Sequence, residues 1–489
     1  MNLVDLDKIV VVGGGSAGLI TALMLKKTFV TKLVQVIKSD KVGIIGVGES
    51  STEHITRFMN HIGISEYDLI KNCGATLKGG VYFQGFSNED FMHSISEPYN
   101  RKIYNYNLMY GQLIGYKKNK HNMYPEFLNH GEVPTVAFNN NPWINQYHLD
   151  TYKFNEYLIK LCKERGIHIF DRKIKEEDIS IDDKGNLNIF ESNADLYIDC
   201  TGFQKLLAKK LNFDWLSYKE KLPLNSAVAF PTEEMEEYNL YTLAKTMDNG
   251  WLWRIPTQGR TGNGYVFNKD FTTLDKIEKE IHKLYGNKIK IERSFEFEPG
   301  YYKQMWKNNV VVAGLSSSFI EPLEATSIGS TIQQIFILMD YLPSQDKESA
   351  NKQYNYLMEN LFNFVQLHYK VKKDNTPFWK YVKNDLPTSN YLKQYLPIWK
   401  NRLPKNSDFD GGWNMFYAEN FINILFGLDL FDLNKITQEC RLYPYYERFN
   451  ITKIFRSERN YEKNCVKISH KKFIEMIIKD QKKKENVIY

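Results

Sequence analysis

The sequence predicts an α/β fold that begins with a dinucleotide-binding unit, carries a β-rich insertion and ends in a mostly helical region. Three observations lead to this prediction. A short β-branched run, Lys8–Val12, leads directly into the glycine loop Gly13-x-Gly15-x-x-Gly18. Short apolar runs with strand character recur up to residue 314. From Gly329 onward, the apolar residues follow a helical and aromatic pattern.

The N-terminal segment has the order strand, loop, helix, strand. Lys8–Val12 is predicted as the first strand, Leu19–Leu25 as the helix and Val34–Ile37 as the second strand. In such a unit the glycines permit a tight turn, close approach of the backbone to a pyrophosphate, and close packing of helix on strand. The helix N-terminus supplies free N–H groups and a favourable dipole for phosphate. The segment therefore predicts a dinucleotide site.

The middle of the chain alternates strands with a helix, and its last part is helical. Tyr152–Arg165 has helical character, and Asp199-Cys200-Thr201-Gly202 is a turn at a strand end. Further strands are predicted at Ile167–Phe170, Ile179–Ile181, Leu187–Phe190, Leu196–Cys200 and Val310–Gly314. Further helices are predicted at Thr331–Leu342, Tyr354–Tyr369 and Ile422–Phe431. We expect an α/β domain over residues 1–330, with β-rich insertions at about 75–150 and 215–300, and a mainly helical domain over 331–489.

Composition and charge narrow the class of protein. Of the 489 residues, 43% are hydrophobic and 25% charged, as in ordinary soluble globular proteins. The net charge is +6, and the lysines form no concentrated basic surface of the kind a nucleic-acid-binding protein needs. The five cysteines contain no CxxC pair, so we expect a reducing compartment without a disulfide framework or a metal site. A short, acidic N-terminus unlike a signal peptide, and no apolar run of about 18 to 20 residues, lead us to expect a cytoplasmic protein without a membrane span.

Several motifs follow one another along the chain. The glycine loop precedes Gly46-Val47-Gly48-Glu49-Ser50, and Lys78 lies in the apolar run of residues 75–83. Trp251-Leu252-Trp253-Arg254-Ile255-Pro256 comes next, followed by residues 319–328 with Glu321 and Glu324. In this order the motifs resemble those of the flavin-dependent halogenases of the tryptophan-halogenase type. The resemblance runs from the N-terminus to about residue 380 and is most specific at the lysine run and the Trp-x-Trp-x-Ile-Pro motif.

The resemblance implies a Rossmann-like FAD-binding domain of the flavin monooxygenase type, in an enzyme that halogenates an electron-rich aromatic ring. In that family reduced FAD, O₂ and a halide give hypohalous acid, which passes through the protein to a separate substrate pocket. Lys78 is the expected catalytic lysine, because a lysine is a compact hydrogen-bond donor and, when deprotonated, a nucleophile. Glu324 is the expected carboxylate that polarises the oxidant and takes the proton from the ring, with Glu321 as its rival.

The resemblance also implies contacts to the cofactor and to the halide. Thr326 and Ser327 are expected to present backbone amides to chloride, bromide or iodide. Two positions depart from the family: Ala325-Thr326-Ser327 replaces the usual Ser-Thr-Gly, and Lys38 stands where relatives often carry an acid that binds the adenosine ribose. The residues expected to contact FAD are Gly13, Gly15, Ser16, Ala17, Gly18, Ser39, Glu49, Ser50, Leu315 and Ile328.

On the substrate side, the resemblance implies a contact at His93 and Ile95, where tryptophan halogenases carry a His and a Phe. Trp413 is a further candidate from the C-terminal region. Because the Phe is absent and the tryptophan-binding segment is not clearly matched, we expect an indole or phenol rather than free tryptophan. Relatives take reduced FAD from a separate flavin reductase, and this chain has no second nucleotide-binding glycine loop. A flavin-dependent aromatic monooxygenase and a flavin-binding protein without catalysis remain alternatives, and formation of a homo-oligomer stays open.

Overall fold

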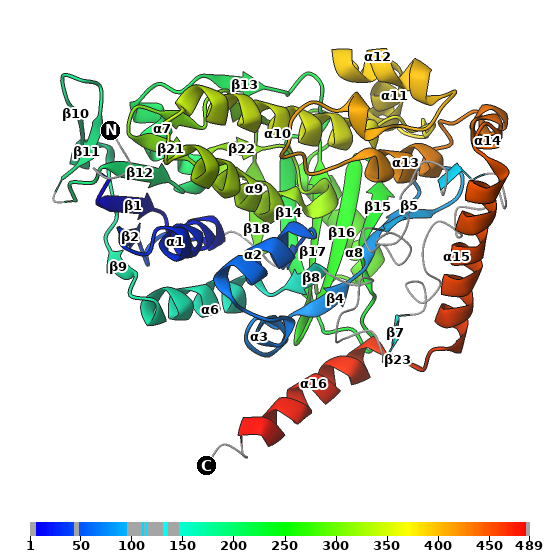
Figure 1. Ribbon diagram of the computed structural model, residues 1–489, viewed down its shortest axis with the longest axis horizontal. Coiled ribbons are helices and arrows are strands. Elements are labelled where there is room, and N and C mark those ends of the chain that lie inside the picture. Colours follow the sequence, from blue (N-terminus) through cyan, green and yellow to red (C-terminus); the bar gives the residue numbers. More distant parts are fainter. Residues whose placement is uncertain are drawn as a thin grey trace.

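The computed structural model describes residues 6–43, 48–94, 110–111, 114, 131–134, 146–190 and 192–485. It contains a six-stranded sheet, whose labelled strands lie at the left of Figure 1, and a seven-stranded sheet nearer the middle, and helices from the last third of the chain lie over and beside them. The predicted combination of an α/β domain, a β-rich insertion and a mostly helical C-terminal region is confirmed.

The six-stranded sheet carries the predicted dinucleotide-binding unit. β1 (Lys8–Val12) lies in the middle and pairs in parallel with β2 (Leu33–Lys38) and β12 (Leu196–Asp199). Val10 and Val11 are fully buried, as expected for a central parallel strand with both faces covered. The helix α1 begins at Ser16 rather than at Leu19 and ends at Thr28. The outer strands are β9 (His168–Asp171), β21 (Val310–Val312) and β20 (Trp306–Lys307).

The seven-stranded sheet joins two distant parts of the sequence. Its order is β18-β14-β17-β16-β15-β5-β6, and its pairs are antiparallel except for the parallel pair β15–β5. That pair places residues 80–84 beside residues 241–245. The strands are β5 (Gly80–Gln84), β6 (Phe91–Ser94), β14 (Ser226–Thr232), β15 (Tyr241–Met247), β16 (Gly250–Thr257), β17 (Arg260–Phe267) and β18 (Arg293–Glu296).

A small three-stranded sheet carries Lys78. Its order is β3 (Glu49–Ser50), β8 (Gln146–Leu149) and β4 (Thr76–Lys78), with β8 in the middle. Both pairs are antiparallel. The remaining strands are β7 (Glu132–Pro134), β10 (Ile179–Ile181), β11 (Leu187–Ile189), β13 (Trp215–Ser217), β19 (Gly300–Tyr302), β22 (Ser318–Phe319) and β23 (Lys467–Ser469).

The helical bounds differ from the predicted ones where local geometry decides. α9 (Thr326–Tyr341) and α10 (Lys347–Leu367) begin earlier than predicted. The prediction of a helix over Ile422–Phe431 was wrong in both bounds, because α13 runs from Ala418 to Gly427 and the chain then turns through Asp429 at φ 56°. The other helices are α2 (His54–Ile62), α3 (Glu66–Asn72), α6 (Thr151–Glu164), α7 (Leu206–Lys210), α8 (Leu274–Tyr285), α11 (Pro377–Asn384), α12 (Asn390–Trp399), α14 (Leu433–Arg441), α15 (Tyr445–Asn464) and α16 (His470–Glu485).

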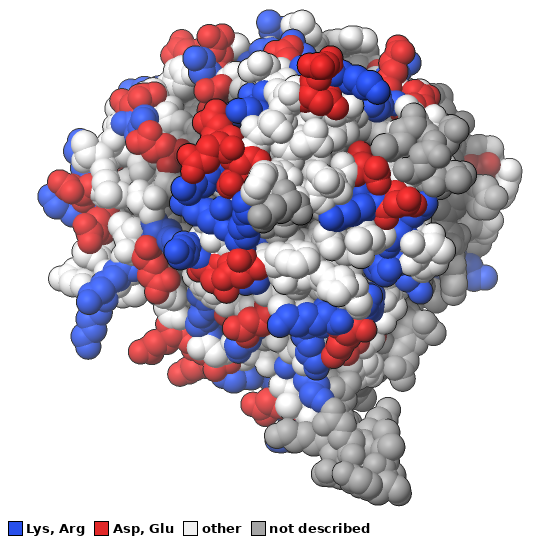
Figure 2. Space-filling view, turned by 90° about the vertical axis from the view of Figure 1, so that its left-hand side faces the viewer, with Lys and Arg blue, Asp and Glu red and all other residues white. Residues whose placement is uncertain are grey.

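The surface is mixed in charge. On the face shown in Figure 2, basic and acidic side chains are interspersed rather than gathered into separate regions. Among the described residues, no helix combines the length and apolar character needed to cross a bilayer.

Candidate active site

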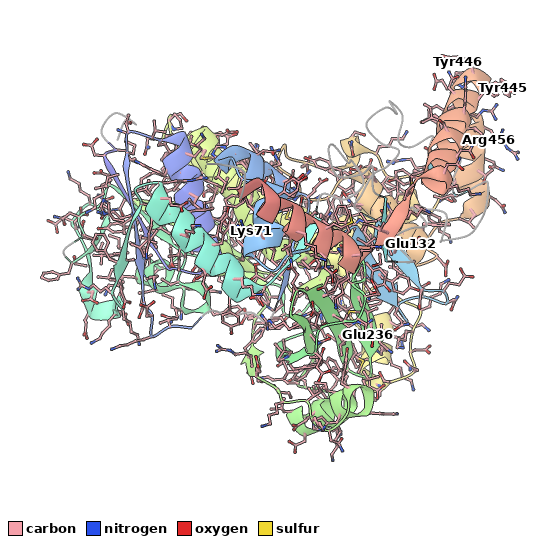
Figure 3. The ribbon with its side chains drawn as sticks, turned by 90° about the horizontal axis from the view of Figure 1, so that it is seen from below. Lys71, Glu132, Glu236, Tyr445, Tyr446 and Arg456 are labelled. Carbon is pink, nitrogen blue, oxygen red and sulfur yellow. The ribbon has the colours of Figure 1, made fainter. Side chains whose placement is uncertain are left out.

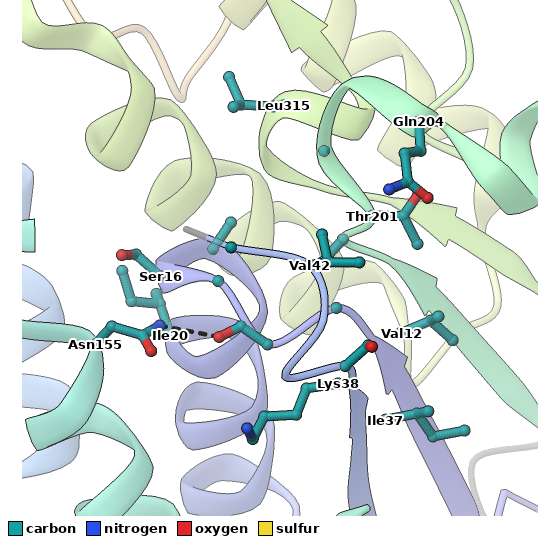
Figure 4. Close-up of a pocket in the computed structure, with 18 of the residues that line it drawn as sticks. Val12, Ser16, Ile20, Ile37, Lys38, Val42, Asn155, Thr201, Gln204 and Leu315 are labelled. Carbon is teal, nitrogen blue, oxygen red and sulfur yellow. Dashed lines mark hydrogen bonds between the residues drawn. The ribbon is translucent and has the colours of Figure 1, made fainter. Parts of the chain in front are cut away.

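The glycine loop between β1 and α1 opens onto a cavity of about 570 Å³ (Figure 4). Gly13 has φ 127°, and a Cβ there would lie 2.1 Å from the carbonyl oxygen of Cys200. A Cβ on Gly18 would lie 2.0 Å from the carbonyl oxygen of Gly13. A Cβ on Gly15 would meet no atom within 4 Å. Packing therefore requires Gly13 and Gly18, whereas Gly15 keeps open the space in front of α1.

Side chains from distant elements hold the walls of this cavity. Asn155 of α6 donates from Nδ2 to the carbonyl oxygen of Gly14 at 2.9 Å (Figure 4). At the end of β12, Asp199 accepts hydrogen bonds from the N–H and hydroxyl groups of Thr201 at 3.0 and 2.7 Å. It also accepts from two N–H groups of α7, at 2.8 and 2.9 Å. Thr201 lines the cavity. By fixing the conformation of the predicted strand-end turn, Asp199 therefore positions this part of the cavity wall.

The cavity fits the nucleotide part of FAD. No side chain caps α1 and its first turn has no acidic residue, which leaves the positive end of the helix available to a pyrophosphate. Ser16 Oγ and Glu49 Oε2 are buried without a hydrogen-bond partner among the described residues. Ser50 lines an adjoining cavity instead, and Gly18 lies within α1. The residues expected to contact FAD that line the cavity are Gly13, Gly15, Ser16, Ala17, Ser39, Glu49, Leu315 and Ile328.

Lys38 lies at the end of β2 and also lines this cavity. Its Nζ contacts the carboxylate of Asp40, which lines the cavity too. The hydrogen bond and the charge of Lys38 lower the pKa of Asp40. Position 38 thus carries a lysine in place of the acid that relatives often have, and this lysine is paired with Asp40.

A second cavity of about 180 Å³ adjoins the first. Trp251 and Trp253 of β16 line it, with ring centroids 6.1 Å apart. Gly264 faces Trp253 across the β16–β17 pair, and a Cβ there would lie 2.0 Å from the indole. Thr326 and Ser327 line the cavity and form the first turn of α9, whose positive end suits an anion. The two cavities share Glu49, Phe203, Leu315, Ser327 and Ile328.

Lys78 is completely buried at the end of β4. Its Nζ donates to the carbonyl oxygen of Ser51 at 2.7 Å. Since β8 lies between β4 and β3, the lysine side chain crosses over β8 beside Gln146, its partner in the β4–β8 pair. Burial lowers the pKa of Lys78 from 10.5 to about 7, while the charge of Glu324 acts in the opposite direction. Lys78 can therefore exchange between ammonium and amine near neutral pH.

Glu324 lines the second cavity and has a left-handed backbone with φ 67°. Its Oε1 lies 2.9 Å from Nδ1 of His93 and 2.9 Å from Nε2 of His368. Burial raises the pKa of Glu324, but the charges and hydrogen bonds of the two histidines outweigh burial and lower the pKa to about 2. Its Oε2 has no hydrogen-bond partner among the described residues. The carboxylate is therefore ionised, and one of its oxygens is available for a further hydrogen bond.

The hydrogen bonds of His368 determine which of its ring nitrogens carry a proton. Its Nδ1 lies 2.8 Å from the carbonyl oxygen of Phe364, which can only accept, so Nδ1 carries a proton. With Glu324 ionised, the contact between Nε2 and Oε1 needs a second proton, and the ring is then a cation. His93 Nε2 lies 3.3 Å from Nδ2 of Asn420, so both ring nitrogens of His93 face protein groups. Glu324 is thus flanked by two imidazoles that share its Oε1.

The rival carboxylate Glu321 has a different environment. Its Oε1 accepts a hydrogen bond from the hydroxyl of Tyr369 at 2.6 Å. Burial raises the pKa of Glu321 to about 8, against the effect of that hydrogen bond. At neutral pH Glu321 therefore holds a proton and Glu324 does not, and opposite pKa shifts in neighbouring carboxyl groups are typical of groups with different tasks.

The structure separates the predicted substrate residues. His93 on β6 is fully buried against Glu324, so its substrate contact stays a prediction. Ile95 lies outside the described residues, as do Gly46 and Val47 of the second motif. The ring contacts of Trp413 are with Phe336, at 6.1 Å between centroids, and with the guanidinium of Arg57, rather than with Lys78 or Glu324.

Three residues at this site were not assigned a role from the sequence. The first is His368, which contacts Glu324. The sequence could have indicated it through the His368-Tyr369 pair at the end of an apolar helical run. The second is Ser51, whose backbone carbonyl accepts a hydrogen bond from Lys78. A backbone contact of this kind cannot be recognised from the residue type. Gln146 is fully buried opposite Lys78, and its amide has no hydrogen-bond partner among the described residues.

Comparison with known proteins finds relatives over most of the chain. Residues 8–436 match the tryptophan halogenase family. The chain is 28% identical over 477 residues to tryptophan 6-halogenase SttH of Streptomyces toxytricini, covering 87% of this chain and 90% of that one. It is 26% identical over 462 residues to tryptophan 7-halogenase RebH of Lentzea aerocolonigenes, covering 84% and 85%. The crystal structure of SttH superposes with a TM-score of 0.84 at 26% identity, over 96% of this chain and 99% of that chain.

Proposed function

The chain belongs to the tryptophan halogenase family, and on this premise we propose that it halogenates an electron-rich aromatic molecule of the indole or phenol class. As a flavin-dependent halogenase it is an oxidoreductase that uses FADH₂. Reduced FAD, when bound in the cavity of the glycine loop, supplies the activation of O₂ that converts a halide ion into hypohalous acid. The one nucleotide-binding glycine loop in the sequence is assigned to FAD, which leaves none for NAD(P)H. A separate flavin reductase therefore delivers the reduced cofactor.

One observation carries the proposal: a fully buried lysine lies within electrostatic reach of an ionised, buried glutamate that lines the cavity beside the FAD site. Burying a lysine costs stability unless partners compensate. Strongly shifted pKa values next to a cavity are typical of functional groups. A flavin protein that only binds its cofactor needs neither Lys78 nor Glu324 in these environments.

The two residues have different tasks in this proposal. Lys78 holds the oxidant by donating a hydrogen bond from Nζ, with its orientation set by the Ser51 carbonyl. Glu324 orients the same oxidant through its free Oε2 and accepts the proton that leaves the ring. The backbone N–H groups of Thr326 and Ser327, at the start of α9, bind the halide next to the flavin.

The substrate differs from free tryptophan in this proposal. The relatives SttH and RebH carry tryptophan in their names, but two features of this chain favour another arene. His93 has both ring nitrogens against protein groups, and Ile95 replaces the second aromatic residue of the indole clamp.

The test is mass spectrometry of activated phenols and indoles incubated with the protein, FAD, a flavin reductase, NADH and bromide. Brominated product is expected with wild type and with Lys160→Ala, a control lysine whose side chain is 64% exposed. Lys78→Ala should form no product while FADH₂ oxidation continues. Equal product from Lys78→Ala and wild type would remove the role of Lys78, and hydroxylated product would favour an aromatic monooxygenase.

A further inference from the structure

The C-terminal segment beyond the family match returns to the strand that carries Lys78. The match ends at residue 436. After α15, β23 pairs in antiparallel fashion with β7, where Ser469 lies opposite Glu132. α16 then lies along α3, and Figure 3 shows it between the labelled Lys71 of α3 and Glu132 of β7. A segment far from every catalytic motif is thereby placed next to β4.

The buried face of α16 begins with a histidine. His470, Phe473, Ile474 and Ile477 are buried and recur at helical spacing, whereas Lys472 and Glu475 are exposed. Three of the four buried residues are apolar, as expected for a helix that packs on α3. His470 is fully buried and polar, so its ring nitrogens need hydrogen-bond partners within the protein.

The imidazole of His470 connects two backbone segments. Its Nε2 accepts a hydrogen bond from the N–H of Leu77 at 2.9 Å, and its Nδ1 lies 3.3 Å from the carbonyl oxygen of Tyr238. These partners require a proton on Nδ1 and none on Nε2. Burial lowers the pKa of His470 to about 3, against hydrogen bonds to the backbone of Tyr238 and Asn239. Nε2 therefore remains an acceptor at neutral pH.

This bridge supports the edge of β4 to which no strand pairs among the described residues. One edge of β4 pairs with β8. On the other edge, the N–H of Leu77 bonds to His470 and the N–H of Gly79 bonds to the carbonyl oxygen of Leu240 at 2.6 Å. Leu77 and Gly79 are the two neighbours of Lys78, so these bonds determine where the backbone of the lysine lies.

We propose that His470 is a positioning residue for Lys78: its imidazole replaces a strand partner along β4 and holds the backbone from which the lysine reaches the oxidant. The inference rests on the function proposed for Lys78. The side chain of Lys78 starts from the backbone of β4 and ends at the Ser51 carbonyl, to which Nζ is bonded. A shift of the β4 backbone would therefore move Nζ relative to that carbonyl. A misplacement of about 1 Å costs up to roughly 100-fold in rate when a catalytic group must meet its partner.

A simpler role for His470 would be to anchor α16 alone. Separate substitutions distinguish the two roles. His470→Leu keeps an apolar side chain on the buried face but removes the acceptor for Leu77. Ile474→Ala weakens the packing of α16 but keeps His470. His470→Gln offers an amide oxygen at about the reach of Nε2, with an NH₂ group for Tyr238.

The experiment measures two quantities in these variants of the full chain. The first is the ratio of brominated arene formed to FADH₂ oxidised. The second is hydrogen–deuterium exchange of peptides that contain Leu77, in protein without added flavin. We expect His470→Leu to lower the product ratio about tenfold and to speed exchange at Leu77. His470→Gln should return both quantities to within about twofold of wild type, and Ile474→Ala should lower the thermal midpoint while keeping the product ratio.

Two results would overturn the inference. The first is a wild-type product ratio in His470→Leu, and the second is an equal loss of that ratio in Ile474→Ala. If His470→Leu does not fold, His470→Asn takes its place, because its shorter amide cannot reach Leu77; a wild-type product ratio there again overturns the inference. Lys78→Ala in the same assay separates the two proposals. If Lys78→Ala still forms product, the role proposed for Lys78 is refuted. If Lys78→Ala forms no product while His470→Leu keeps the wild-type product ratio, only the positioning role of His470 is refuted.

Discussion

Lys78→Met should make the protein inactive and more stable, by an amount that depends on pH. Lys78 is completely buried, and its pKa falls from 10.5 to about 7, mainly through burial. Between these values the unfolded chain binds a proton at Lys78 that the folded protein does not hold. The stability of wild type therefore rises with pH across this window and carries the full cost of the buried charge below it. Methionine has a similar length and no charge.

The magnitude follows from the two pKa values. Each pH unit between about 7 and 10.5 corresponds to about 1.4 kcal/mol, which gives about 5 kcal/mol for the whole window. Because Lys78 is half protonated near pH 7, the expected advantage of the variant there is about 4 kcal/mol, falling to about 2 kcal/mol at pH 9. Loss of the hydrogen bond to Ser51 subtracts about 1 kcal/mol at every pH. The pH-dependent difference of about 2 kcal/mol is thus the quantity to measure.

The assay is urea unfolding followed by tryptophan fluorescence, with wild type and variant compared at pH 7, 8 and 9. Lys160→Met is the matched control, because its side chain is 64% exposed, and its difference from wild type should not vary with pH. A Lys78→Met advantage that stays constant from pH 7 to pH 9 would show that Lys78 does not lose its proton in the folded protein. The same variant should form no halogenated product.

Two further predictions concern the cavity and the carboxylates. Gly15→Val should weaken FAD binding in a fluorescence titration without lowering the thermal midpoint, because its side chain enters open space. Gly18→Val should instead lower the midpoint, because its Cβ would lie 2.0 Å from a carbonyl oxygen; unchanged FAD affinity in Gly15→Val would contradict the assignment of the loop. Glu324→Gln should slow halogenation by at least about tenfold and Glu321→Gln by less than about twofold, since the ionised group near Lys78 is Glu324. The opposite order of rates would transfer the role to Glu321.

Sequence patterns were sufficient where the signal is local. The β-branched run, the glycine loop and the following apolar stretch lie within 30 residues, and they form β1 and α1 as expected. The end of α13 was missed because it depends on a left-handed Asp429 rather than on apolar periodicity.

The partners at the site come from too far away in the sequence for such patterns to reveal them. His93 and His368 lie 231 and 44 positions from Glu324, and they decide that its carboxylate is ionised. His470 lies 393 positions from Leu77 and belongs to a helix whose sequence suggests ordinary packing. Each of these contacts depends on how the sheets and the C-terminal helices assemble, which no motif records.

The low pKa of Glu324 suits the proton transfer in the proposed reaction. When a halogen adds to an aromatic ring, the cationic adduct is a far stronger acid than a carboxylic acid, so a weak base is enough to remove its proton. A carboxylate with a pKa of about 2 stays ionised at neutral pH, whereas a more basic one would hold a proton of its own and could not accept another. Glu321, whose pKa is about 8, is in that second state. By holding Glu324 between them, His93 and His368 therefore select which of the two neighbouring carboxyl groups can take the proton from the ring.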